Sequence, residues 1–297
     1  MPSKVGVIDL MLQIPTADGK KRYDFLRPLL LDQESRDSFD FPAQYMFKDI
    51  PDTSSASDYV ALTLREMDKY GIERAMVGLS RGHSSAEAER GLSEHPDRFF
   101  PSFEVNPNLG MEGVRDLVRA HEKYGIKAAT AFPSGLCPQV PINDKKFYPL
   151  YAKCVELDIP VRIYTSMNYA NDRPYDLGHP RHLDQVAIDF PELRIIAGLA
   201  GWPWINDMVG LLRRHPNLAC DTASHHPRYF GTAGSGWEML LQFGNTLLQD
   251  KVMVGFSAEQ FGLSIAEMVK LYEALPLKEA VVEKWLYGNA RRFLRLP

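Results

Sequence analysis

The chain has 297 residues, of which 45% are hydrophobic and 24% are charged, and its formal net charge is -4. This composition is that of an ordinary soluble globular protein, long enough for one large or two small domains. The slightly acidic balance gives no electrostatic reason to expect nucleic acid, and no apolar run approaches the roughly 18 residues that span a bilayer.

The three cysteines are scattered along the chain, at positions 137, 154 and 220. Their spacing matches neither a disulfide framework nor a set of zinc ligands. We therefore expect a cytoplasmic protein that binds neither membranes nor nucleic acid.

Short apolar runs alternate with longer stretches of helical apolar spacing. The predicted strands are Lys4–Leu10, Arg74–Leu79, Phe99–Val105, Lys127–Phe132, Pro160–Thr165, Arg194–Leu199, Leu218–Thr222 and Val252–Phe256. The predicted helices are Ser57–Met67, Ser85–Ser93, Met111–Lys123, Lys146–Glu156, His182–Phe190, Ile205–Arg214, Gly236–Phe243 and Ser264–Ala274. The strands are nearly continuous in apolar residues, as in a parallel sheet that is buried on both faces.

This alternation predicts an α/β protein, a (β/α)8 TIM barrel. An open doubly wound sheet is the rival fold, but no glycine fingerprint follows the first strand. We expect a single domain over residues 1–297, because no linker or repeat interrupts the pattern. Two long connections, at about 11–56 and 165–181, should rise over the carboxyl-terminal face, where barrel active sites lie.

Several motifs occur in a fixed order along the chain. They are His95-Pro96-Asp97-Arg98-Phe99, Phe190-Pro191-Glu192-Leu193-Arg194-Ile195-Ile196, Gly201-Trp202-Pro203-Trp204, His215–Thr222 and Tyr287–Leu294. Each motif is weak alone, but together they resemble the amidohydrolase-related family, in its decarboxylase-like branch. The first strand, which contains Asp9, resembles the opening strand of that family.

The resemblance implies a divalent metal held by four histidines and one aspartate at five strand ends. The residues that stand at these positions are Met11, Gln13, Tyr164, Leu199 and Ser257. Thioether, amide, phenol, alkyl and hydroxyl groups do not supply the imidazole and carboxylate donors that such a metal needs. The sequence therefore predicts no metal and no other cofactor, and metal-activated water is not the expected mechanism.

Arg162 and Tyr164 are the main candidates for the remaining chemistry. They lie two residues apart on one strand and so share a face. Tyr164 should point into the site, because the family's histidine at that position does. Arg162 either binds a substrate carboxylate or forms an internal salt bridge with an acid, for which the candidates are Asp9, Glu104 and Asp221. Tyr164 either donates to an oxyanion or fills the core.

Candidate acids and bases follow the seventh and eighth strands. The predicted catalytic residues are Tyr164, Asp221, His225 and Glu259. An imidazole titrates near neutral pH, although a solvated loop histidine is the alternative at positions 225 and 226. The predicted substrate-binding residues are Gln13, Arg81, His83, Glu104, Arg162, Tyr169, Trp202 and Ser257.

These residues predict a metal-independent hydrolase acting on a small carboxylated cyclic or aromatic metabolite, for example by lactone opening. A lyase that decarboxylates or hydrates a similar substrate, or an isomerase, would use the same groups. A catalytically silent homologue that binds a ligand or partner is a further alternative. So is an enzyme with a relocated metal on Asp9, His225, His226 and Glu259. The family resemblance also implies a homodimer.

Overall fold

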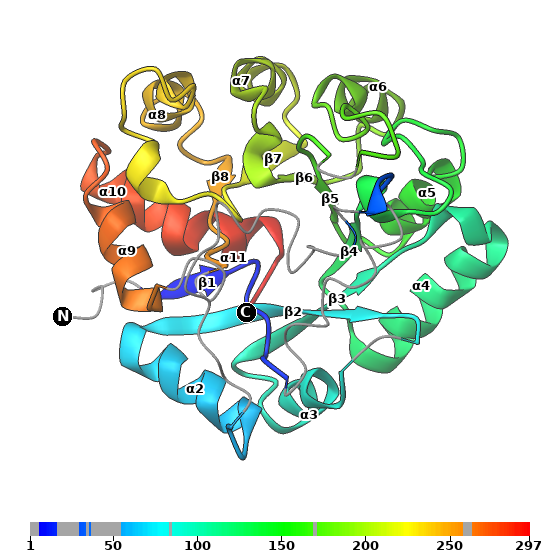
Figure 1. The fold of residues 1–297 in the computed structure, drawn as a ribbon, viewed down its shortest axis with the longest axis horizontal. Coiled ribbons are helices and arrows are strands. Elements are labelled where there is room, and N and C mark those ends of the chain that lie inside the picture. Colours follow the sequence, from blue (N-terminus) through cyan, green and yellow to red (C-terminus); the bar gives the residue numbers. More distant parts are fainter. Residues whose placement is uncertain are drawn as a thin grey trace.

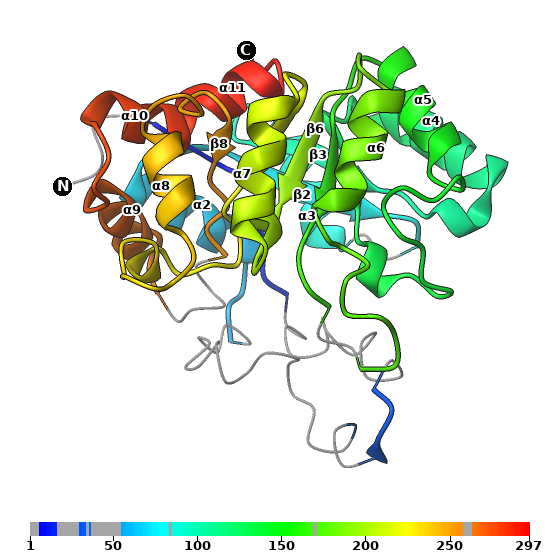
Figure 2. The same ribbon diagram turned by 90° about the horizontal axis from the view of Figure 1, so that it is seen from above.

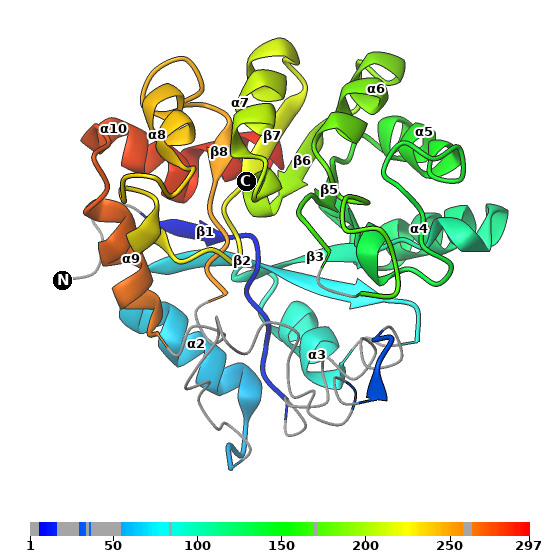
Figure 3. The same ribbon diagram turned by 45° about the horizontal axis from the view of Figure 1, so that its top comes forward.

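The computed structural model describes residues 6–16, 30–33, 36, 55–82, 85–168, 171–257 and 263–297. Eight parallel strands follow one another in the order of the sequence, and helices surround them as an outer ring (Figures 1 and 3). The strands are β1 (Val7–Asp9), β2 (Ile72–Ser80), β3 (Phe99–Glu104), β4 (Ala128–Ala131), β5 (Val161–Tyr164), β6 (Ile195–Gly198), β7 (Leu218–Asp221) and β8 (Val252–Met253). The predicted TIM barrel is confirmed, with every predicted strand in place.

The helices that follow the strands also agree with the predicted helices. They are α2 (Tyr59–Tyr70), α3 (Ala86–Glu94), α4 (Met111–Tyr124), α5 (Tyr148–Glu156), α6 (Arg181–Asp189), α7 (Ile205–Arg214), α8 (Glu238–Gly244) and α9 (Ile265–Glu273). Local capping explains several of their ends. Asp58 caps the first turn of α2 and Gly71 ends the helix in the left-handed conformation, at a φ of 71°.

The barrel closes between its first and last strands just beyond their regular ladder. The Leu10 amide donates to the Val254 carbonyl at 3.1 Å. The buried Asp9 carboxylate adds a second connection, because its Oδ1 accepts from the amides of Met11 and Phe256, each at 2.9 Å. Asp9 therefore joins β1 to the segment that follows β8.

A cluster of buried apolar side chains lies inside the barrel and extends to the carboxyl-terminal helix. Its members from the strands and the adjoining turn are Ile8, Leu10, Met76, Phe100, Ala128, Ile196, Ala219 and Met253. The same cluster contains Ala290, Phe293 and Leu294 from the carboxyl-terminal end of the chain. This end forms α10 (Glu279–Glu283), a π-helical turn at Lys284–Gly288 and α11 (Asn289–Phe293), none of which the apolar pattern predicted. Figure 2 shows α11 at the end of the barrel opposite the connection that follows β5.

The connection at 165–181 is held by a buried guanidinium. Arg173 donates to the carbonyls of Ser134 and Leu136 at 2.9 and 2.7 Å, and it pairs with the neighbouring Asp172. The described part of the 11–56 connection reaches the same region, where the Leu31 amide donates to Asn171 Oδ1 at 2.9 Å. No helix in the described ranges is both long and apolar enough to cross a membrane.

Candidate functional site

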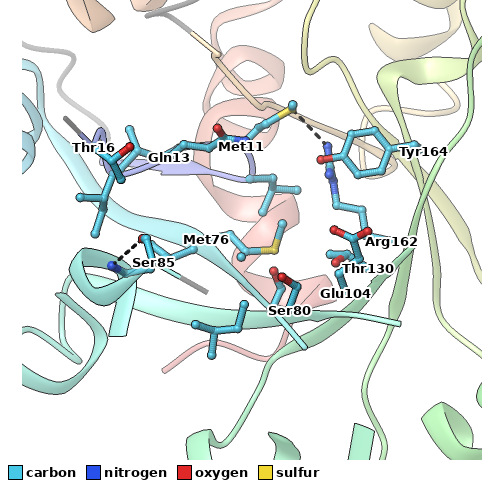
Figure 4. A pocket seen from close by; sticks show the side chains of 18 residues that line it. Met11, Gln13, Thr16, Met76, Ser80, Ser85, Glu104, Thr130, Arg162 and Tyr164 are labelled. Carbon is cyan, nitrogen blue, oxygen red and sulfur yellow. Dashed lines mark hydrogen bonds between the residues drawn. The ribbon is translucent and has the colours of Figure 1, made fainter. Parts of the chain in front are cut away.

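A pocket of about 390 Å³ lies inside the barrel at the carboxyl ends of β1 to β5 (Figure 4). Apolar side chains from the segment after β1, from β2 and from α3 contribute to its lining. Its polar side chains are Gln13, Thr16, Ser80, Ser85, Ser102, Glu104, Thr130, Arg162 and Tyr164. The pocket therefore offers one apolar side and one side that is rich in hydrogen-bonding groups.

Four of the polar residues form one row across four neighbouring strands. Ser80 is paired in register with Glu104, Glu104 with Thr130, and Thr130 with Arg162. Residues at the same level of a barrel point to the same side, and all four line the pocket. The row places a carboxylate and a guanidinium on one wall with a hydroxyl group between them.

Arg162 is 1% exposed and forms a bidentate ion pair with Asp221 at the end of β7. Its Nε donates to Asp221 Oδ2 at 2.6 Å and its Nη2 donates to Oδ1 at 3.1 Å. Burial acts to lower the pKa of the Arg162 guanidinium, but Asp221 and Tyr164 together, through charge and hydrogen bonds, outweigh it and the pKa lies above its usual value. Asp221 Oδ1 also accepts from the amides of Leu199 and Ala223, at 3.2 and 3.0 Å.

Tyr164 and Met11 lie against the same guanidinium (Figure 4). The Arg162 Cζ atom lies 4.7 Å from the centre of the Tyr164 ring, which is a cation–π distance. Arg162 Nη2 lies 3.9 Å from the Met11 sulfur, and the Ser224 hydroxyl lies 3.6 Å from that sulfur. The Ser257 hydroxyl lies 3.4 Å from the Ser224 hydroxyl.

His225 lies in an aromatic cluster that occupies the β6 to β8 side of the barrel. Its ring lies 5.6 Å from that of Trp202 and 5.1 Å from that of Trp237, measured between ring centres. Burial lowers the pKa of His225 to about 4, so the imidazole is neutral at physiological pH. Neither His225 nor Trp202 lines the pocket.

The remaining predicted residues fall in three places. Gln13 lines the pocket, as do Glu104, Arg162 and Tyr164. Arg81 has a side chain 54% exposed and pairs with Asp116 on α4 at 2.7 Å. His83, Tyr169 and Glu259 lie outside the described residues.

Four non-glycine residues shortly after β6, β7 and β8 have left-handed backbones, and one of them is Ala200, with a φ of 50°. The φ angles of Leu199, Ser224 and Ser257 are 67°, 57° and 47°. Such conformations cost free energy and are concentrated at functional sites. Two of these residues, at 199 and 257, stand at the positions where the family resemblance implies metal ligands.

The amidohydrolase family profile matches residues 84–296, which is more than half of the chain. The chain belongs to the amidohydrolase family. A search of curated proteins finds no match. Among solved structures, an uncharacterised TIM-barrel protein from Bordetella bronchiseptica is 24% identical, with a TM-score of 0.73 and coverage of 98% of this chain and 99% of that one.

Two enzymes of known activity share the fold. The 5-carboxyvanillate decarboxylase of Novosphingobium aromaticivorans, solved with manganese and 3-methoxy-4-hydroxy-5-nitrobenzoic acid, is 17% identical, with a TM-score of 0.63. The match covers 99% of this chain and 98% of that one. The 4-oxalomesaconate hydratase of Rhodopseudomonas palustris is 18% identical, with a TM-score of 0.60 and coverage of 97% and 95%. The family is thus confirmed by its profile, and these structures confirm the fold.

The residues of this amidohydrolase do not fit the metal that its family implies. Arg162 and Ser224 both contact the Met11 sulfur, so a cation and a hydroxyl already occupy the space around that position. The carboxylate of Asp221 is fully engaged by the guanidinium and two amides. Among the described residues, no group of three His, Cys, Asp or Glu side chains could hold a metal ion. This amidohydrolase is a divergent member without the usual ligand set.

Several lining residues were not singled out from the sequence. They are Thr16, Met76, Ser80, Ser85, Ser102 and Thr130. Thr130 had a usable signal, because it lies two residues before the end of a predicted strand, at the level of Arg162 on the next strand. Ser80 and Ser102 are small hydroxyl residues near strand ends, a pattern too common to mark a site.

Proposed function

We propose that this amidohydrolase is a metal-independent hydrolase of a small carboxylated cyclic or aromatic metabolite, of the lactone type. The main support for this proposal is the polar row in the pocket, in which the Glu104 carboxylate lies on the same wall as Arg162 and Tyr164. We also propose that residues 1–297 act as one domain, in a cytoplasmic homodimer.

Glu104 is the proposed general base. Asp221 and His225, the other predicted candidates within the described residues, are less suitable because neither lines the pocket. Glu104 ends β3 on the pocket wall and is exposed there. Proton abstraction from water by a positioned carboxylate typically contributes about 10² to 10⁴ in rate.

Tyr164 and Arg162 are the proposed partners of the substrate's oxygen atoms. The Tyr164 hydroxyl donates to the oxyanion that forms when water attacks the ring carbonyl. Arg162 spends Nε and Nη2 on Asp221, and Nη1 is the nitrogen that takes part in neither bond. Nη1 is therefore the proposed donor to the substrate carboxylate.

The proposed step balances without a cofactor. The water oxygen bonds to the carbonyl carbon while Glu104 takes one of its protons. The tetrahedral intermediate then collapses, the ring carbon–oxygen bond breaks, and the leaving alkoxide takes the proton from Glu104. The product is a hydroxy acid that carries both the original and the new carboxyl group.

A lyase is the second candidate, because the enzymes of known activity that share the fold are a decarboxylase and a hydratase. Glu104 would then move a proton at carbon, and an isomerase would use the same acid. A silent binding protein is less well supported. The pocket is open, and its lining includes Met11 but neither Leu199 nor Phe256, whose packing would have closed it.

The test is turnover of a panel of carboxylated lactones and aromatic acids by Glu104→Gln and Tyr164→Phe. On the substrate that the wild type hydrolyses, we expect kcat to fall by about 10² to 10⁴ for Glu104→Gln and by about 10² to 10³ for Tyr164→Phe. Product analysis separates the candidates, since ring opening adds water, decarboxylation releases carbon dioxide and isomerisation conserves mass.

Two surface variants serve as matched controls. Glu122→Gln lies on α4 and Tyr229→Phe lies on an exposed turn after β7, and neither residue lines the pocket. Both should keep the activity of the wild type. Full activity of Glu104→Gln and Tyr164→Phe on the true substrate would refute the proposal.

A further inference from the structure

We infer that the Arg162 guanidinium is an internal cation that replaces the divalent metal of the family and holds the strand ends of the site together. The inference does not depend on the proposed hydrolysis, because it concerns the binding of cations and the stability of the barrel. It rests on the contacts of this one buried side chain.

The guanidinium lies at the meeting point of the strand ends that carry the replaced ligands. Met11, Tyr164 and Leu199 stand at three of the five ligand positions. The Met11 sulfur contacts Nη2 of Arg162, and the Tyr164 ring faces Cζ. The Leu199 amide donates to Asp221, the partner of Arg162. The Arg162–Asp221 pair thus joins β5 to β7 and contacts the residues that follow β1 and β6.

The backbone leaves room for this arrangement. A Cβ atom on Gly198 would lie 3.2 Å from the Ile163 carbonyl oxygen and 3.4 Å from Cζ and Nη2 of Arg162, so the guanidinium packs directly against this glycine. A Cβ atom on Gly255 would lie 2.7 Å from the Ala223 Cβ and 3.1 Å from the Met11 Cβ. Glycine at position 255 therefore leaves room for Ala223 and for Met11, which contacts the guanidinium.

The charge balance also favours one built-in cation over an added one. Asp221 is 0% exposed, and its single negative charge is matched by the single positive charge of Arg162. A divalent ion at Asp221 would have to displace the guanidinium or lie beside it, where the two positive groups would repel each other. The pair therefore excludes the metal as well as replacing it.

Removal of the guanidinium should create a cation-binding cavity. In Arg162→Ala, the Asp221 carboxylate stays buried without its partner, and we expect the melting temperature to fall by roughly 10 °C. Millimolar ethylguanidinium should restore at least half of that loss by filling the cavity with the missing group. The neutral analogue N-ethylurea should not, because it has the shape without the charge. Arg115→Ala removes an exposed arginine and should show neither the loss nor the rescue.

Rescue by N-ethylurea equal to that by ethylguanidinium, or no rescue by either, would overturn the inference. If Arg162→Ala does not fold, Arg162→Met is compared with the double variant Arg162→Met, Asp221→Asn. The double variant should be the more stable one, because it removes the stranded charge while keeping an acceptor for the Leu199 and Ala223 amides. Equal stability of the two would count against the inference.

Metal binding by the wild type gives an independent readout. When the protein is added to Mn²⁺, the electron paramagnetic resonance signal of the free ion should keep its full intensity. A loss of signal that corresponds to one ion per chain would contradict the replacement of the metal by Arg162, whatever reaction the protein catalyses.

Discussion

At the scale of single residues, Asp9 is a buried acid with an unusual balance of partners. Its Oδ1 accepts two backbone bonds, whereas its Oδ2 is buried without a hydrogen-bond partner among the described residues. Burial raises the pKa of Asp9 to about 6, despite the two amides and the nearby Arg162. The ionised form is therefore costly in the folded protein.

This shift predicts a specific dependence of stability on pH. The folded pKa is raised above the unfolded value of 3.8, so the folded state holds the proton more tightly. The contribution of Asp9 is then fully present below about pH 4 and is lost as the pH rises through about 6, by roughly 3 kcal/mol. Asp9→Asn should lack this loss. Urea unfolding of both proteins at pH values from 4 to 7 measures it, and a constant difference between them would contradict the assignment.

The sequence could supply the candidates at this scale but not their pairing. Arg162 was expected to need an acid, and Asp9, Glu104 and Asp221 were all open. The choice depends on where β5 and β7 lie across the barrel, which no local pattern encodes. The contact of Met11 with Arg162 could not be predicted either, because it joins residues that are 151 positions apart in the sequence.

At the scale of elements, the connection after β5 is fixed to the connection after β4 by one side chain. Arg173 is buried and donates to two carbonyls beyond β4, those of Ser134 and Leu136. Arg162 and Tyr164 lie on β5, directly before this connection. We therefore expect the anchoring of the connection to help hold these two side chains in the pocket wall.

Arg173→Met should loosen that connection. The loss of the two charged hydrogen bonds predicts destabilisation of roughly 2 kcal/mol and faster amide hydrogen exchange in residues 171–180. Arg181→Met is the control, because Arg181 makes a single exposed ion pair with Asp176, which should be worth less than about 1 kcal/mol. Unchanged exchange in Arg173→Met would show that other contacts hold the connection.

Most elements were predictable because their signals are local. Apolar runs marked the strands, and helical apolar spacing marked the helices between them. The last helices were missed because α10 and α11 have five residues each and are joined by a π-helical turn. Their apolar residues therefore do not keep a helical period, and their position is set by packing into the barrel.

At the scale of the whole molecule, the barrel has two unlike sides. The β1 to β5 side holds the open pocket, with its row of polar side chains. The β6 to β8 side is filled by aromatic packing around His225, Trp237 and Phe230. The Arg162–Asp221 pair crosses between the two sides. The ligand positions that the family resemblance implies therefore lie beside this polar centre, on which the proposed metal-independent function rests.

The most direct test of this account is the activity of metal-stripped protein on the substrate found in the lactone and aromatic-acid panel. Protein dialysed against a chelator and checked by elemental analysis should keep the full kcat, and added Mn²⁺ or Zn²⁺ should not raise it. Loss of activity on chelation, with recovery on adding one metal ion per chain, would contradict the metal-independent mechanism.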